Sequence, residues 1–143
     1  MQMIRKYRES DIDQVLDIWL SASIKAHAFI GSDFWRSKVG EMRDVYLPAS
    51  ETFVFESEGQ LAGFYSLYEN TLAAAFVSPN LQGRGVGSAL INDAKSRREC
   101  LQLTVYSENL PSINFYKKHG FIVLDEKMDE LTGHPELVME CCC

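Results

Sequence analysis

Three glycines in five residues, Gly83, Gly85 and Gly87, follow a short apolar run and open a segment with helical apolar spacing. Glycines at a helix start let the backbone approach a ligand closely and aim unpaired N–H groups at an anion. Gln82 and Arg84 add side-chain donors to the same loop. The pattern indicates an anion-binding loop, although a helix start that only needs flexible residues would use the same glycines.

The spacing of the loop excludes two common phosphate-binding motifs. A Walker loop needs a Gly-Lys-Ser/Thr sequence, which does not follow here. The dinucleotide fingerprint needs wider glycine spacing and an acidic residue about twenty positions later. The loop instead resembles the pyrophosphate-binding signature Gln/Arg-x-x-Gly-x-Gly/Ala of the GCN5-related N-acetyltransferases (GNAT), which Gln82, Gly85 and Gly87 match.

A second motif lies downstream of the loop. The segment 109–121 is similar to the family's segment in which an Asn precedes a helix that ends in a Tyr-x-x-x-Gly-Phe turn. The two motifs stand in the family's order, and the resemblance is specific over residues 72–121. Further residues extend it to small bacterial single-domain members of the YiaC-like kind: Trp19, His27, Phe29, Ile30 and Trp35.

The resemblance implies an α/β (α+β) fold of the GNAT type. Such a fold has a central mixed, mostly antiparallel sheet of about seven strands, flanked by about four helices. Its fourth and fifth strands run parallel and then splay apart to admit the pantetheine arm of coenzyme A. The resemblance also implies one N-acetyltransferase domain over residues 1–143, acetyl-CoA as co-substrate and no metal.

The family pattern assigns residues to the co-substrate. The glycine loop and Ser88 would hold the pyrophosphate, Asn109 would lie against the pantetheine, and Phe115 would pack beside it. A backbone N–H of the preceding strand would face the thioester oxygen. The full implied cofactor-binding set is Ala75, Phe76, Val77, Gln82, Gly83, Arg84, Gly85, Val86, Gly87, Ser88, Asn109 and Phe115.

Tyr116 is implied as the general acid that gives a proton to the departing thiolate. A tyrosine, with a reference pKa near 10, keeps its proton at neutral pH. The general base stays open, because Thr104 occupies the position where several protein-directed members carry a Glu. Glu69, near the turn that enters the strand before the loop, is the first alternative. His27, which ordinarily titrates near neutral pH, is the second, and a water chain is the third.

The acceptor is expected to be a primary amine, either a protein or peptide lysine or a small molecule. By resemblance, His27 and Phe29 lie in a connection that overhangs the acceptor site, although a packing loop would use the same apolar residues. Two other functions stay open. The chain could be a catalytically inactive acyl-CoA-binding sensor or regulatory module, or a plain interaction domain.

The elements that must position these residues follow from periodicity and turn residues. Apolar positions at helical spacing and β-branched runs predict four helices and seven strands. The expected helices cover about 12–23, 32–46, 86–98 and 111–119, and the expected strands cover 3–8, 51–56, 61–68, 72–77, 100–106, 121–124 and 137–140.

Composition excludes some classes of partner. With 143 residues and a formal charge of −6, the chain is too acidic for a nucleic-acid binder. It contains no signal-peptide core and no apolar run long enough for a membrane span, so we expect a cytoplasmic monomer or homodimer. Cys100 stands alone and Cys141–Cys143 are consecutive, which predicts free thiols rather than a disulfide framework.

Overall fold

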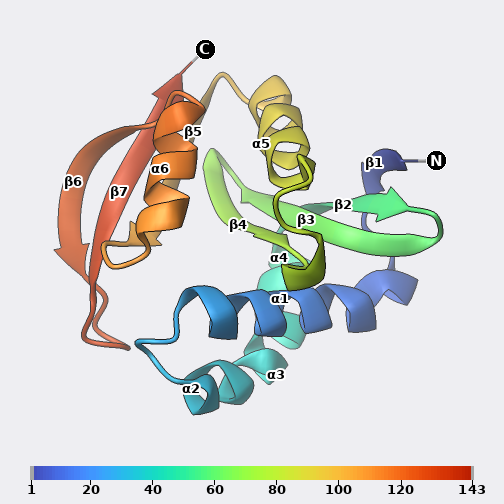
Figure 1. Cartoon of the computed structure of the whole chain (residues 1–143), viewed down its shortest axis with the longest axis horizontal. Helices are drawn as coiled ribbons and strands as arrows, with labels where there is room; N and C mark the ends of the chain where they lie inside the picture. Colours follow the sequence, from blue (N-terminus) through green and yellow to red (C-terminus); the bar gives the residue numbers. More distant parts are fainter. Residues whose placement is uncertain (1, 143) are drawn as a thin grey trace.

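The computed structural model describes residues 2–142 as a seven-stranded sheet with helices on both faces (Figure 1). The strand order is β1-β2-β3-β4-β5-β7-β6, and every neighbouring pair is antiparallel except β4 with β5. The strands are β1 (Gln2–Lys6), β2 (Glu51–Ser57), β3 (Gln60–Tyr68), β4 (Thr71–Val77), β5 (Cys100–Tyr106), β6 (Ile122–Met128) and β7 (Pro135–Cys142). This architecture confirms the expected fold class.

Four longer helices and several short ones connect the strands. The longer ones are α1 (Ile12–Ala26), α2 (Ser32–Ser37), α5 (Val86–Arg97) and α6 (Leu110–Lys118). The short ones are η1 (Glu9–Asp11), α3 (Val39–Glu41), the π-helical turn η2 (Met42–Tyr46), α4 (Leu47–Ala49) and η3 (Pro79–Leu81). Over residues 2–142 no helix has both the length and the apolar character that crossing a membrane requires.

Two cores lie on the two faces of the sheet. On one face, α5 buries Val86, Leu90, Ile91 and Ala94 against β3, β5 and β7, together with Ile113 of α6. On the other face, α1 buries its stripe of Val15, Leu16, Ile18 and Trp19 against β2 and β3. Both stripes have the i, i+3, i+4 spacing that places side chains on one side of a helix. The helices therefore hold the middle of the sheet from both sides.

The parallel strands β4 and β5 diverge soon after they meet. Their only matched pair in the described chain is Thr71 with Gln102, whereas β4 pairs with β3 along nearly its whole length. Figure 1 shows the two strands separating toward their carboxyl ends. The edge of β4 that faces β5 is consequently free of a sheet partner over most of the strand.

Several expected boundaries differ from the structure. The expected helix over 32–46 is interrupted at Lys38, which separates α2 from an unbroken helical run of α3, η2 and α4. This run continues to Ala49, because Pro48 stands in the first turn of α4, where a proline is tolerated. Strands β6 and β7 extend to Met128 and Cys142, beyond the predicted ends. The charged residues at the end of β6 and the cysteines at the end of β7 do not have a pattern typical of a strand. β6 is an exposed edge strand, and such strands accommodate charged residues.

The prediction of free thiols is wrong for two of the four cysteines. Cys100 and Cys142 form a disulfide, whereas Cys141 is a buried free cysteine. The register of β5 with β7 places Cys100 directly opposite Cys142, a relationship that their distance of 42 positions in sequence conceals. Cys143 lies outside the described residues.

Candidate active site

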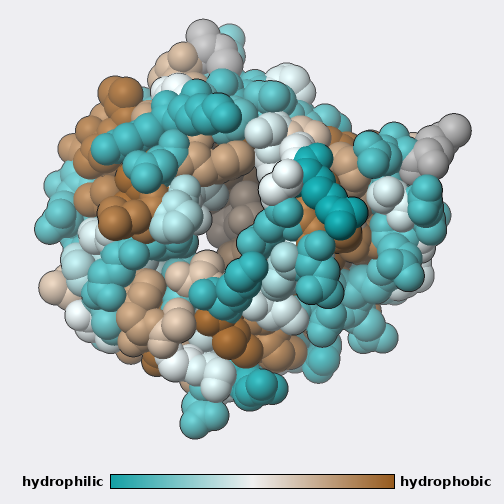
Figure 2. Space-filling model, in the orientation of Figure 1, coloured by the Kyte–Doolittle hydropathy of each residue, from teal (hydrophilic) through white to brown (hydrophobic). Residues whose placement is uncertain are grey.

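Two cavities meet at the gap between β4 and β5. The first, of about 860 Å³, lies between the glycine loop, α5, α6 and the end of α1. The second, of about 660 Å³, lies on the side of η2 and α4. Six residues line both: His27, Ala75, Phe76, Asn109, Ser112 and Tyr116. Figure 2 shows the molecular surface hollowed here on one face. Because the two cavities share these lining residues, two molecules could meet in the gap.

The glycine loop forms one wall of the first cavity. Gly83 and Gly85 have φ of 81° and 85°, in the left-handed region that favours glycine. Gly85 precedes the first residue of α5, whose opening N–H groups have no partner within the helix. A Cβ on Gly87 would lie 3.4 Å from Cζ of Phe115, so the backbone forms part of the cavity wall. Such a wall fits an anionic group such as a pyrophosphate.

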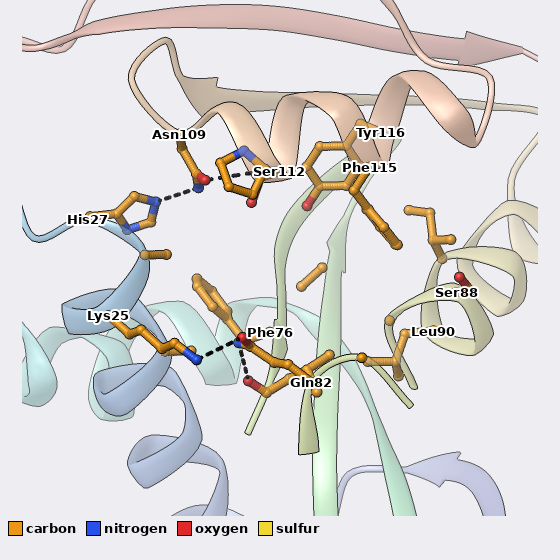
Figure 3. A pocket seen from close by; sticks show the side chains of 18 of the residues that line it. Lys25, His27, Phe76, Gln82, Ser88, Leu90, Asn109, Ser112, Phe115 and Tyr116 are labelled. Carbon is orange, nitrogen blue, oxygen red and sulfur yellow. Dashed lines mark hydrogen bonds between the residues drawn. The ribbon is translucent and has the colours of Figure 1, made fainter. Parts of the chain in front are cut away.

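Positive charge gathers around the same cavity. Lys25 of α1 and Lys118 of α6 both line it. Lys25 Nζ donates to Gln82 Oε1 at 3.3 Å, and Gln82 Nε2 donates to the carbonyl of Val77 at 3.3 Å (Figure 3). Sequence analysis missed both lysines. The predicted end of α1 at residue 23 left Lys25 off the helix, and a lysine in the last turn of α6 is ordinary by itself.

Most of the residues expected to bind co-substrate line the first cavity, but two do not. Val86 is buried in the core beneath α5, and Arg84 is exposed without lining the cavity. The ten that line it are Ala75, Phe76, Val77, Gln82, Gly83, Gly85, Gly87, Ser88, Asn109 and Phe115.

Tyr116 lines both cavities from α6 (Figure 3). Burial raises the pKa of its phenol to about 12. Its hydroxyl makes no hydrogen bond to any other residue in the range 2–142. A protonated phenol without a protein partner at the meeting point of two cavities is able to donate a proton to a bound molecule.

His27 and Asn109 join the end of α1 to the start of α6. Asn109 Oδ1 accepts from the backbone N–H of Ser112 at 3.3 Å, which caps α6 and fixes the amide orientation. Asn109 Nδ2 therefore donates to His27 Nε2, 3.1 Å away (Figure 3). A ring nitrogen that accepts a hydrogen bond carries no proton, so His27 is neutral with its proton on Nδ1.

The expectation that His27 titrates near neutral pH is wrong. Burial lowers the pKa of its imidazole to about 4, and only 8% of the residue is exposed. Its Nε2 is also occupied by Asn109. His27 still lines both cavities, and Phe29 lines the first with its ring 5.9 Å from that of His27.

Glu69 lines neither cavity, although Tyr68 and Thr71 on the two sides of its turn line the second. Glu69 lies in the tight turn between β3 and β4 with a φ of 54°, and its side chain is exposed. Its carbonyl accepts from Arg98 Nε at 2.8 Å. The turn conformation and the bond from Arg98 thus hold the backbone of Glu69, and its exposed carboxylate is not part of either cavity wall.

The second cavity was not foreseen from the sequence, apart from Thr104 and the residues it shares with the first cavity. Its walls are aromatic, and they carry one carboxylate among the described residues, that of Glu136. The aromatic residues come from seven separate elements, so no local pattern could reveal them: Trp19, Trp35, Tyr46, Tyr68, Phe76, Tyr106 and Tyr116. The described chain contains no group of three or more His, Cys, Asp or Glu able to hold a metal.

This geometry defines a class of protein in which an anionic co-substrate and a second substrate meet inside a split sheet. The acetyltransferase (GNAT) domain model matches residues 48–123. Peptidyl-lysine N-acetyltransferase YiaC of Escherichia coli (strain K12) is 38% identical over 138 residues, which cover 96% of this chain and 94% of that protein. The chain therefore belongs to the GNAT family.

Solved structures agree with this assignment. Apo YjaB from Escherichia coli aligns with a TM-score of 0.86 and 28% identity, covering 98% of this chain and 97% of that one. PaiA N-acetyltransferase from Thermoplasma acidophilum, in complex with coenzyme A, shares the fold at a TM-score of 0.83 and 19% identity, covering 100% and 99%. The chain is an N-acetyltransferase that uses acetyl-CoA, as the sequence indicated.

Proposed function

We propose that this chain is a peptidyl-lysine N-acetyltransferase whose single catalytic domain spans residues 1–143. The observation that carries the proposal is the second cavity, a chamber with aromatic walls that reaches the gap beside Tyr116. A lysine side chain has a slender apolar stem and a cationic end, which suit aromatic walls. The similarity to a relative named as a peptidyl-lysine N-acetyltransferase supports the same acceptor.

The first cavity would hold acetyl-CoA. The glycine loop and Ser88 would bind the pyrophosphate through N–H and hydroxyl groups at the start of α5. Lys25 and Lys118 would add positive charge, while Asn109 and Phe115 would lie along the pantetheine. Bound there, acetyl-CoA supplies an acetyl thioester that a neutral amine can attack.

Two groups of this chain would assist the transfer. The free edge of β4 over 75–77 offers backbone N–H groups that could stabilise negative charge on the thioester oxygen. Tyr116 would donate its proton to the departing sulfur, since its raised pKa keeps the phenol protonated at neutral pH. His27 would orient Asn109 and border the acceptor, with Phe29 beside it.

The acceptor is tested by incubating the protein and acetyl-CoA with a lysine peptide that has a blocked amino terminus. We expect mass spectrometry to find one added acetyl group on the lysine nitrogen, and about 100-fold less product with the Tyr116→Phe variant over the same time. A panel of small amines serves as the comparison. Acetylation of small amines alone would overturn the peptide assignment while leaving the acetyltransferase activity in place.

Cellular location and assembly are also proposals. We infer that the enzyme works in the cytoplasm as a monomer or homodimer without a nucleic-acid partner. The cytoplasmic location is supported by the need for coenzyme A, which is highly charged and does not cross membranes unaided. The formal charge of −6 argues against a nucleic-acid partner. The Cys100–Cys142 disulfide is more typical of oxidising compartments, so cell fractionation with thiol trapping is the relevant test.

A further inference from the structure

The second cavity contains an unused carboxylate, that of Glu136, near Thr104, the position at which this chain lacks the Glu that several family members carry. Thr104 cannot act as a base, and it faces the same side of β5 as Gln102 and Tyr106. In the β5–β7 ladder, Thr104 lies opposite Val138 and Tyr106 lies opposite Glu136. Directly opposed residues share one face of a sheet, so Glu136 is on the same face as Thr104, one diagonal away. The neighbouring strand thus brings a carboxylate to the face on which β5 has none.

The surroundings of Glu136 leave its carboxylate available. Glu136 is half-buried and lines the second cavity. Its carboxylate forms no hydrogen bond or ion pair with another residue of the described chain. The nearby Asp129 is engaged by the Tyr106 hydroxyl at 2.6 Å, the Leu131 N–H at 3.0 Å and the Thr132 hydroxyl at 3.2 Å. Asp129 is therefore satisfied by its own loop, whereas Glu136 is not.

The charges that act on Glu136 come from three elements. Burial and then Asp129 raise the pKa of Glu136, while Lys127 of β6 lowers it. Tyr106 of β5 stays protonated, since burial and its bond to Asp129 raise its phenol pKa. A carboxylate with a raised pKa is a better proton acceptor at neutral pH than an exposed one.

A second buried polar group in the same cavity lacks a partner. Trp35 is 8% exposed and lines the second cavity, and its Nε1 has no acceptor among residues 2–142. A buried indole N–H usually has a hydrogen-bond partner. The Nε1 atom itself is inaccessible, so Glu136 supplies the polar group that an ammonium entering this cavity could reach.

We propose that Glu136 receives the acceptor ammonium in the second cavity and takes its proton, directly or through one water. The inference rests on the proposed peptidyl-lysine function. The ammonium loses one proton to Glu136, which passes it to solvent. The resulting amine forms the C–N bond as the C–S bond breaks. Tyr116 protonates the departing sulfur, and the second nitrogen proton returns through water to the Tyr116 phenolate, so an ammonium and a thioester give an amide, a thiol and one free proton.

The test compares Glu136→Gln with the matched control Glu140→Gln. Glu140 is on the same face of β7 but does not line the cavity. We expect E136Q to lower kcat/KM for a lysine peptide by about 100-fold at pH 7, with the deficit shrinking as the pH approaches the amine pKa. E140Q should stay within threefold of wild type. Wild-type activity in E136Q, or a deficit that is equal at all pH values, would overturn the role.

A binding measurement keeps this inference separate from the proposed function. Calorimetry should show that E136Q binds acetyl-CoA like wild type, and that it binds the lysine peptide at least tenfold more weakly. A norleucine peptide, which lacks the ammonium, should bind both proteins equally. Equal lysine-peptide affinity in E136Q and wild type would overturn the role of Glu136. If the wild type binds the lysine peptide but does not acetylate it, the proposed function fails and the ammonium site stands.

Discussion

Asn109 Nδ2 and His27 Nε2 lie 3.1 Å apart although 82 residues separate them in the sequence. Each side chain is more than nine-tenths buried, and each lines both cavities. Their bond connects the end of α1 to the cap of α6 across the site where the two substrates would meet. The bond therefore fixes the end of α1 relative to the start of α6, two elements that no backbone ladder connects.

The burial of His27 predicts a pH dependence of stability. The pKa of His27 is about 4 in the folded protein against 6.5 in the unfolded chain, so below pH 6.5 protons bind preferentially to the unfolded state. The contribution of neutral His27 to the free energy of unfolding is complete above pH 6.5 and is lost as the pH falls toward 4. From pH 7.5 to 5, His27 alone should remove about 2 kcal/mol of unfolding free energy.

The His27→Gln variant checks this prediction, because glutamine can accept from Asn109 but does not titrate. Urea unfolding at pH 7.5 and pH 5 should show a smaller loss of stability in the variant than in wild type, by about 2 kcal/mol. All other titrating groups are common to both proteins. Identical losses would contradict a neutral, buried His27.

Tyr116→Phe removes a hydroxyl that has no hydrogen-bond partner among the described residues. We expect folding and acetyl-CoA affinity to be unchanged and kcat to fall by about 100-fold, the usual cost of losing a general acid. Calorimetry and thiol-release kinetics measure the two quantities. A parallel loss of acetyl-CoA affinity would point to a binding role for the phenol instead.

Gly63 has a packing role that its place in β3 does not reveal. A Cβ at this position would lie 2.7 Å from the carbonyl oxygen of Phe76 and 3.0 Å from Cδ1 of Leu90. Gly63→Ala should lower the unfolding free energy by about 1–3 kcal/mol, since β4 and α5 would have to move. Gly40→Ala, where no atom lies within 4 Å, is the control and should be neutral or slightly stabilising. Equal stabilities of the two variants would contradict this packing.

The disulfide between Cys100 and Cys142 closes a loop with a sequence separation of 42. Its loss should lower stability by about 4 kcal/mol through the greater freedom of the unfolded chain. Thermal unfolding with and without a reductant measures this in wild type, while Cys100→Ser should be insensitive to the reductant. A wild type that is equally stable under both conditions would argue that the bond is absent in solution.

The sequence predicted the parts of this molecule that local patterns determine. The glycine loop, the α5 stripe from Val86 to Ala94 and the alternation of β5 are set by residues close in the chain. Each is found where the pattern indicated, with β5 bounded as predicted. The order of the two motifs also led to the correct family, fold and co-substrate.

Features that depend on contacts between distant segments were missed. The Cys100–Cys142 pair and the shared face of Thr104 and Glu136 both follow from the β5–β7 register. The pKa of His27 depends on burial by the surrounding elements, which its sequence neighbours do not show. Nearness to β4 in sequence predicts Glu69 as a base, but its exposed side chain lines neither cavity.

The most direct test of the account is calorimetric titration of acetyl-CoA into wild type, Gly87→Leu and Asn92→Leu. Gly87 lines the first cavity against Phe115, so a leucine there would occupy the space of the co-substrate. Asn92 is exposed on the same helix and does not line the cavity. We predict stoichiometric binding to wild type and Asn92→Leu and a loss of at least 100-fold in affinity in a folded Gly87→Leu protein. Undiminished binding to Gly87→Leu would contradict the assignment of this cavity to acetyl-CoA.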